Sequence, residues 1–267
     1  MRLLLALLLM ASLMSSNPNG FRCGTELQEM SVEFLGTDQR IDFDSLSASL
    51  DSLSSYSLSA WVYADEDIVW GTVLQRIDGV DTDQYFRIMI YGGANDNVYF
   101  YSSTFATSLG VWRTGTGTIS PATWYHIALT YNASSTSNNP IIYINGVSKT
   151  VTETTTPVGV VQAITGGSIY IGNNAAKNVD YDGKLADVRT YNAILTAAQV
   201  LSLYNAGAFT ASFDTNLVFN APLTSATTLG GSSFDGFILT SSQLLIDRIG
   251  CVQGTPSGSP LGSDENP

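Results

Sequence analysis

The chain is poor in charged side chains, which make up 13% of its 267 residues, against about 25% in a typical soluble domain. Lysine is scarcest, with Lys149, Lys177 and Lys184 only, and no basic cluster is present. A nucleic-acid partner, which requires such a cluster, is therefore excluded. The formal net charge of −12 is compatible with calcium binding as well as with simple solubility.

Histidine is also scarce, and this limits catalysis. His126 is the single histidine, so a serine or cysteine triad would have one candidate base. The sequence has no phosphate-binding glycine loop, dinucleotide motif or Cys/His metal cluster. We expect His126 to be structural and the protein not to be an enzyme.

Cysteine occurs twice, as Cys23 and Cys251. The two residues lie just outside the two ends of the region in which the sequence has strand-like patterning. In an exported protein such a pair predicts a disulfide. The alternative is two unpaired thiols in a reducing compartment.

Long hydrophobic runs are missing except at the N-terminus, where Arg2 precedes an apolar stretch from Leu3 to Met14. This pattern makes residues 1–20 a signal-like segment, and the run is short for a membrane span. We therefore expect a secreted, cell-surface or virion-surface protein with no membrane span in the mature chain. No Ala-x-Ala cleavage site follows, so the alternative is a retained segment that docks on neighbouring proteins.

What is abundant is β-type patterning with Ser, Thr, Asn and Gly between the strands. Short runs rich in β-branched and aromatic residues predict strands at 31–34, 40–43, 57–63, 84–91, 98–102, 124–131, 141–144, 168–171 and 185–191. In 124–131, alternation places Tyr125, Ile127, Leu129 and Tyr131 on one face, and Trp124, His126 and Ala128 on the other.

Two local signals stand out along the chain. Asn145-Gly146 between two strand runs predicts a hairpin, because both residues tolerate positive φ. Thr196-Ala197-Ala198-Gln199 is a capping box, followed by an apolar stripe and by Gly207 as a C-terminal cap. One short helix is expected there.

The length fits one domain over residues 21–252. Further strand candidates lie within 210–250, namely 216–220, 237–240 and 243–247. We expect them to pair with the other strands in the same β-sandwich domain. Residues 253–267 are rich in Gly, Ser and Pro and acidic, which predicts a flexible tail.

The ordered set of strand motifs resembles the laminin-G-like jelly-roll family of the concanavalin A-like lectin/glucanase superfamily, over residues 30–208. The motifs that carry the resemblance are Ser57-Leu58-Ser59-Ala60-Trp61-Val62, Trp124-Tyr125-His126-Ile127-Ala128, Ile142-Tyr143-Ile144-Asn145-Gly146, Ile171-Gly172-Asn173 and Asp182-Gly183-Lys184-Leu185-Ala186-Asp187-Val188-Arg189. The resemblance implies an all-β fold: a two-sheet antiparallel jelly-roll sandwich with one short helix. It also implies ligand sites on rim loops or on the concave sheet, often with calcium.

The same fold also serves glucanases, which need two carboxylates flanking the scissile bond. Those enzymes carry closely alternating acids on the catalytic strand, and no predicted strand here has them. Asp42 and Asp44 stand at a strand end without such a partner. This supports a non-catalytic protein.

Calcium is the cofactor that the acidic loops suggest, because it binds through six to eight oxygen ligands. Candidate ligands are Asp38 in one loop, and Asp180 with Asp182, near Asn173 and Asn174, in another. Asp78, Asp81 and Asp83 form a third acidic loop. The alternative is that all of these are solvated turn residues.

Aromatic side chains offer a platform on which a sugar could stack. Tyr91, Tyr99, Tyr101 and Trp112 lie in or beside the predicted strands at 84–102 and the following loop, and we take them as candidate ligand-binding residues. The alternative is that they pack in the core, where we place Trp61 and Trp124.

Two hypotheses of function follow. The first is a non-catalytic extracellular binding or adhesion module for a glycan or a surface protein. The second is a structural or decoration protein of a viral or cell-surface assembly. The sequence does not separate them, and both are compatible with an oligomer.

Overall fold

The computed structural model describes residues 31–43, 48–65, 70–78, 84–92, 96–163, 165–207, 215–221 and 223. Several predictions lie outside these residues: the signal-like segment 1–20, the pairing of Cys23 with Cys251, the strands at 237–247 and the tail 253–267. They stay predictions.

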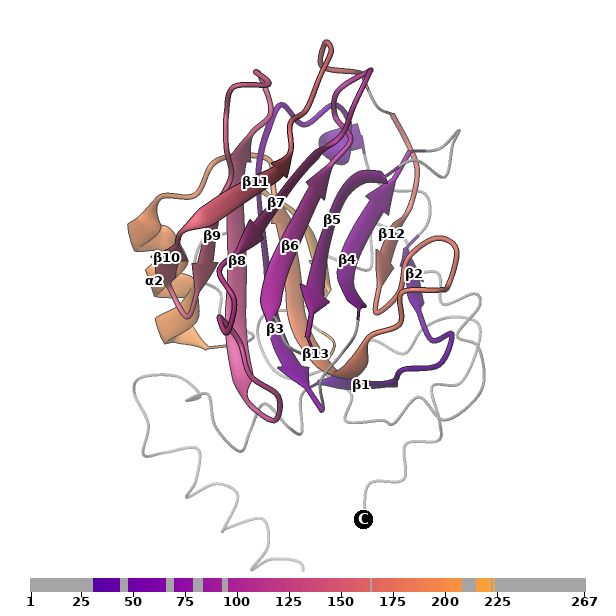
Figure 1. The fold of residues 1–267 in the computed structure, drawn as a ribbon, viewed down its shortest axis with the longest axis vertical. Helices are drawn as coiled ribbons and strands as arrows, with labels where there is room; N and C mark the ends of the chain where they lie inside the picture. Colours follow the sequence, from indigo (N-terminus) through magenta and orange to yellow (C-terminus); the bar gives the residue numbers. More distant parts are fainter. Residues whose placement is uncertain are drawn as a thin grey trace, which may run out of the picture.

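The described residues form two antiparallel sheets that pack face to face, with the second sheet in front of β3 and β13 in Figure 1. The first, called sheet A, has the order β1-β13-β3-β8-β9-β10, and β14 also pairs with β13. Its strands are β1 (Val32–Leu35), β3 (Ser55–Ala64), β8 (Trp124–Asn132), β9 (Ile141–Ile144), β10 (Val147–Lys149), β13 (Asp182–Tyr191) and β14 (Leu217–Ala221).

The second sheet, called sheet B, has the order β11-β7-β6-β5-β4-β12-β2. Its strands are β2 (Ile41–Phe43), β4 (Gly71–Ile77), β5 (Gln84–Tyr91), β6 (Asn97–Ser102), β7 (Gly110–Thr114), β11 (Val151–Thr155) and β12 (Ile169–Ile171). The chain crosses repeatedly from one sheet to the other, as in a jelly roll. The predicted all-β sandwich is confirmed.

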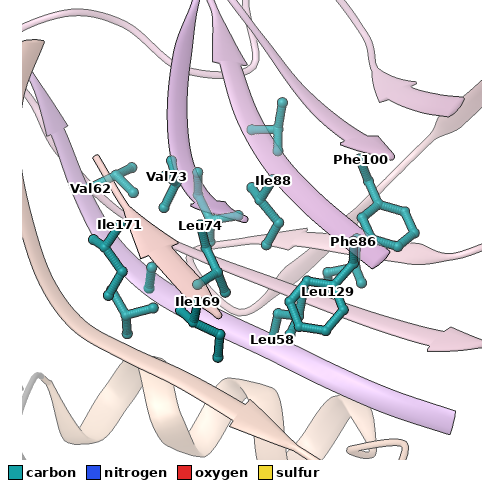
Figure 2. Close-up of a cluster of buried hydrophobic side chains, with 14 of the residues drawn as sticks. Leu58, Val62, Val73, Leu74, Phe86, Ile88, Phe100, Leu129, Ile169 and Ile171 are labelled. Carbon is teal, nitrogen blue, oxygen red and sulfur yellow. The ribbon is translucent and has the colours of Figure 1, made fainter. Parts of the chain in front are cut away.

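The hydrophobic core lies between the sheets and is built from alternate residues of both. Leu58 and Val62 of β3 and Leu129 of β8 meet Leu74, Phe86, Ile88 and Phe100 of sheet B (Figure 2). Because the side-chain period of a strand is two, the alternate residues, such as Trp61 of β3 and Arg87 of β5, point to the outer faces. The predicted alternation of 124–131 is confirmed, since Ile127, Leu129 and Tyr131 belong to the core and Ala128 does not.

One 3-10 turn, η1 (Ala48–Leu50), and one α-helix, α2 (Ala197–Ala206), complete the described elements. Thr196 and Gln199 form the predicted capping box, with Gln199 N–H donating to Thr196 Oγ1 at 3.3 Å and Thr196 N–H donating to Gln199 Oε1 at 2.8 Å. Gly207 caps the C-terminus at φ +77°. The Asn145-Gly146 turn joins β9 to β10 with φ values of +52° and +76°, so the hairpin is also confirmed.

Each strand predicted within the described residues is present, with ends that differ by three residues or fewer. Three strands were not predicted: β4, β7 and β11, all in sheet B. Among the described helices, none has the length and apolar character to cross a membrane.

Candidate functional site

Helix α2 covers part of the outer face of sheet A, where it lies beside β9 and β10 in Figure 1. Val200 and Leu203 of α2 pack with Ala128, Tyr143 and Tyr191 of the sheet. Trp61 stacks on Tyr204 of α2 with ring centroids 5.9 Å apart. Trp61 and Trp124 were expected in the core. Trp61 is buried as expected, in a cluster with Ala186 beneath the helix. Trp124 is only half-buried beside that cluster, which corrects its assignment.

The outer face of sheet B is covered by none of the described helices. Its exposure is uneven: Trp70 is exposed and Arg113 is half-buried, whereas Arg87 is only 8% exposed. Strand register assigns the residues of this face. Gln75 of β4 opposes Arg87 of β5, which opposes Tyr101 of β6. In the next row, Met89 of β5 opposes Tyr99 of β6, which opposes Arg113 of β7.

Four aromatic rings contact one another at this face: Trp70, Tyr91, Tyr99 and Tyr101, called the aromatic row here. The ring centroids of Trp70 and Tyr91 are 4.1 Å apart, and those of Trp70 and Tyr99 are 5.5 Å apart. Tyr99 stacks on Tyr101 at 6.2 Å. Trp70 is 38% exposed, and the three tyrosines are half-buried. The result is a continuous strip of flat apolar surface with polar hydroxyl tips.

Two arginines border the aromatic row on opposite sides of β6. The guanidinium carbon of Arg87 lies 4.6 Å from the centroid of the Tyr101 ring. Burial lowers the pKa of Arg87, whereas the neighbouring Tyr101 raises it. Burial also raises the pKa of the Tyr101 hydroxyl, which therefore stays protonated and available as a donor. Arg113, half-buried on β7, stands opposite Tyr99.

A third arginine, Arg40, lies at the far edge of the same face with its charge compensated. Its Nε and Nη2 donate to the two carboxylate oxygens of Asp42 at 2.5 and 2.8 Å, and its guanidinium lies 3.8 Å from the centroid of the Tyr170 ring. Asp42 is the acidic residue that register places on this face, through its pairing with Tyr170. Its carboxylate is occupied as the acceptor of Arg40.

Trp112 does not belong to the aromatic row, which corrects the prediction. It lies in β7 opposite Phe100, so its ring points into the core, where it is fully buried against Phe100 and Tyr131. Its indole N–H donates to Asn139 Oδ1 at 2.7 Å. Trp70 takes the place on the surface that the sequence argument gave to Trp112.

The acidic residues proposed as calcium ligands are brought together only in part. Asp180 Oδ1 accepts from the backbone N–H of Asp38 at 2.8 Å and from Asn173 Nδ2 at 2.5 Å, so this oxygen ties two loops together. Asp182 is the first residue of β13, and its carboxyl group lies near Gly36. Within the described ranges, no group of three or more His, Cys, Asp or Glu side chains is suited to hold a metal. Of the third acidic loop, Asp81 and Asp83 lie outside those ranges.

His126 is buried beneath α2, 3% exposed, with its ring 5.3 Å from that of Trp61. Burial, together with the nearby positive charge of Arg189, lowers the pKa of His126 to about 3. The imidazole is therefore neutral at physiological pH. Its position between sheet and helix agrees with the expected structural role.

Three residues of this candidate site were not among those taken from the sequence: Trp70, Arg87 and Arg113. Trp70 precedes β4 and Arg113 lies in β7, two of the strands that were not predicted. Arg87 lies in a predicted strand between the core residues Phe86 and Ile88. This alternation was the signal that could have placed Arg87 on the same face of the strand as Tyr91.

The comparisons with known proteins agree with this fold. A laminin-G family model, described as the Concanavalin A-like lectin/glucanases superfamily, matches residues 35–201, and no curated protein sequence matches the chain. A SAP-like pentraxin from Limulus polyphemus has a similar fold, with a TM-score of 0.52 and 16% identity over 68% of this chain and 84% of that one. A putative carbohydrate binding protein from Bacteroides ovatus gives a TM-score of 0.53 and 16% identity, over 76% of this chain and 54% of that one. The family model covers more than half of the chain, and both solved structures have a similar fold. The chain therefore belongs to the concanavalin A-like lectin/glucanases superfamily.

Proposed function

We propose that the chain is a non-catalytic carbohydrate-binding module that takes its ligand on the outer face of sheet B. The observation that carries the proposal is the aromatic row, four touching rings on a sheet face that no described helix covers. A sugar has apolar C–H faces and a polar rim, and it would stack on such rings while its hydroxyls meet the neighbouring polar groups.

The polar groups of the face suit binding better than catalysis. Outward positions of β4, β5, β6 and β7 carry Gln75, Arg87, Tyr101 and Arg113, none of them an acid. Glycoside hydrolysis needs a pair of carboxylates on either side of the bond, and the carboxylate of Asp42 already accepts two hydrogen bonds from Arg40. The similar protein from Bacteroides ovatus, a putative carbohydrate binding protein, adds support by analogy of fold alone.

Two further parts of the proposal rest on the sequence. The export-type N-terminus favours a ligand outside the cell, on another cell or in a matrix. Calcium assistance at Asp38, Asp180 and Asp182 is a separate element of the proposal. Asp38 and Asp180 lie in loops and Asp182 begins β13, and none of the three belongs to the aromatic row.

The test is a broad glycan array probed with the purified chain, in calcium and in chelator, followed by titration calorimetry with the best glycan. Trp70→Ala and Tyr91→Ala are expected to weaken binding at least tenfold, which corresponds to about 1.4 kcal/mol each. Trp124→Ala is the matched control, because it removes a partly exposed tryptophan from the other sheet. Equal losses in all three variants, or binding to no glycan, would contradict the proposal and favour the assembly hypothesis.

A further inference from the structure

Most of the described arginines have a carboxylate partner, and the exceptions lie on one face. The structure describes five arginines, and three of them form ion pairs: Arg40 with Asp42, Arg76 with Asp51 and Arg189 with Asp187. Arg87 and Arg113 are the other two, and no carboxylate of the described residues lies within ion-pair distance of either. Both border the aromatic row.

An arginine without a carboxylate partner is unexpected in a chain of net charge −12. Acidic side chains outnumber basic ones about two to one, 23 against 11, yet the outward positions around Arg87 and Arg113 hold tyrosine, glutamine, methionine, threonine and valine. The face thus has a local positive charge on a protein that otherwise repels anions.

Arg87 also has unused hydrogen-bonding capacity. Its side chain is packed against Tyr101, the residue is 8% exposed, and its buried Nε has no hydrogen-bond partner among the described residues. Burying a guanidinium with an unused donor is unfavourable. A guanidinium packed over a ring is also preorganised for a planar anion, because its donors form a fixed fork.

The separation of the two arginines sets the size of the ligand. Arg87 and Arg113 lie on the two strands that flank β6, one beside Tyr101 and the other beside Tyr99. With strands about 4.8 Å apart and a rise of about 3.4 Å per residue, their Cα atoms are roughly 12 Å apart. An oligosaccharide of two or more sugars would span this separation and could bring one anionic group to each arginine.

We infer that the aromatic row binds an acidic oligosaccharide, whose anionic groups contact Arg87 and Arg113 while its rings stack on Trp70, Tyr91 and Tyr99. The inference rests on the proposed function and adds the class of glycan. Uronic acid carboxylates and sulfate esters share the chemistry that the arginines recognise, so the experiment includes both.

The test titrates the purified chain with oligogalacturonate and with its methyl ester, which has the same backbone without the charges, and with heparin oligosaccharides against neutral desulfated ones. An anionic probe is expected to bind at least tenfold more tightly than its neutral counterpart, with an affinity that falls as salt is raised. Arg113→Gln and Arg87→Gln are each expected to weaken anionic binding about tenfold. Arg87→Lys keeps the charge and loses the planar fork of donors. Its affinity for the anionic probe is expected to lie between those of the parent chain and Arg87→Gln.

Lys149→Gln is the control, because it removes one positive charge from the exposed strand β10 of sheet A, and it is expected to leave binding unchanged. Arg113 is half-buried, so its variant stays informative if Arg87→Gln fails to fold. A neutral glycan that binds the aromatic row as well as the acidic ones would overturn the inference and leave the proposed function intact. Failure of every glycan would overturn both.

Discussion

His126 illustrates how a buried polar residue adds pH dependence without any role in binding. Its Nδ1 has no hydrogen-bond partner among the described residues, and its ring is enclosed by Trp61 and Tyr204. The nearby Arg189 is held by Asp187, with Nε and Nη2 donating at 2.8 and 2.6 Å. Burial opposes the charge of Arg189, but Asp187 raises its pKa. The arginine stays charged and His126 stays neutral.

Protonation of His126 in the unfolded state should therefore destabilise the fold as the pH falls. The folded pKa of about 3 lies below the unfolded value of about 6.5, so stability is complete above pH 6.5 and is lost toward pH 3. Linkage gives a loss of about 2 kcal/mol in the free energy of unfolding between pH 7.5 and pH 5. Urea titrations at these two pH values measure it. His126→Gln should remove most of the difference, and a variant that retains it would contradict the assignment.

Gly183 shows a second constraint that acts on one residue. It lies in β13 at φ +131°, and a Cβ built on it would stand 2.1 Å from the backbone oxygen of Tyr63 in the neighbouring strand. Gly183→Ala is expected to lower the free energy of unfolding by roughly 2–4 kcal/mol, from strain and from displacement of β3. Gly115→Ala is the control, because nothing lies within 4 Å of its built Cβ, and its effect should be within about 0.5 kcal/mol. Chemical denaturation compares the two, and equal effects would argue against the close strand packing.

At the scale of elements, α2 makes the two outer faces of the sandwich different. It covers part of the outer face of sheet A, whereas none of the described helices covers that of sheet B. The helix buries only Val200 and Leu203 of its own residues, so its capping contributes to its stability. Thr196→Ala removes the oxygen that accepts from Gln199 N–H and should cost about 1 kcal/mol in urea titration. Thr196→Ser keeps that oxygen and should remain within about 0.5 kcal/mol of the parent chain. If the two variants lose equal stability, the cap is not the cause.

The sequence predicted sheet A and the helix well, because their signals are local. The capping box, the Asn145-Gly146 turn and the alternation of 124–131 each need only neighbouring residues. Sheet B was predicted less completely. β4 carries Gln75 and Arg76 in its middle and has irregular pairing with β5, and β11 is almost wholly polar and exposed.

The missed strands also explain the error in the candidate site. β7 begins with Gly110, whose place beside the Trp112 ring leaves no room for a Cβ. Because β7 was not predicted, the sequence analysis placed Trp112 in the loop that follows the strands at 84–102. Once β7 pairs with β6, the register turns Trp112 into the core and Arg113 outward. Tyr91, Tyr99 and Tyr101 lie together as predicted, while Trp70 and the two arginines needed the tertiary pairing.

At the scale of the whole molecule, the two outer faces of the sandwich differ in what their aromatic residues contact. Sheet A packs its outward aromatic residues under α2, whereas sheet B presents the aromatic row beside two arginines that lack carboxylate partners among the described residues. The fold is shared with many functions, so the assignment of a glycan site depends on this face and not on the family.

The most direct measurement is hydroxyl-radical footprinting of the chain, with and without the glycan selected on the array, with oxidation of each aromatic side chain read by mass spectrometry. The account predicts that the glycan protects Trp70 and Tyr91 and leaves Trp124 unchanged. Protection of Trp124, or none at Trp70 and Tyr91 under saturating glycan, would place the ligand elsewhere and contradict the central claim.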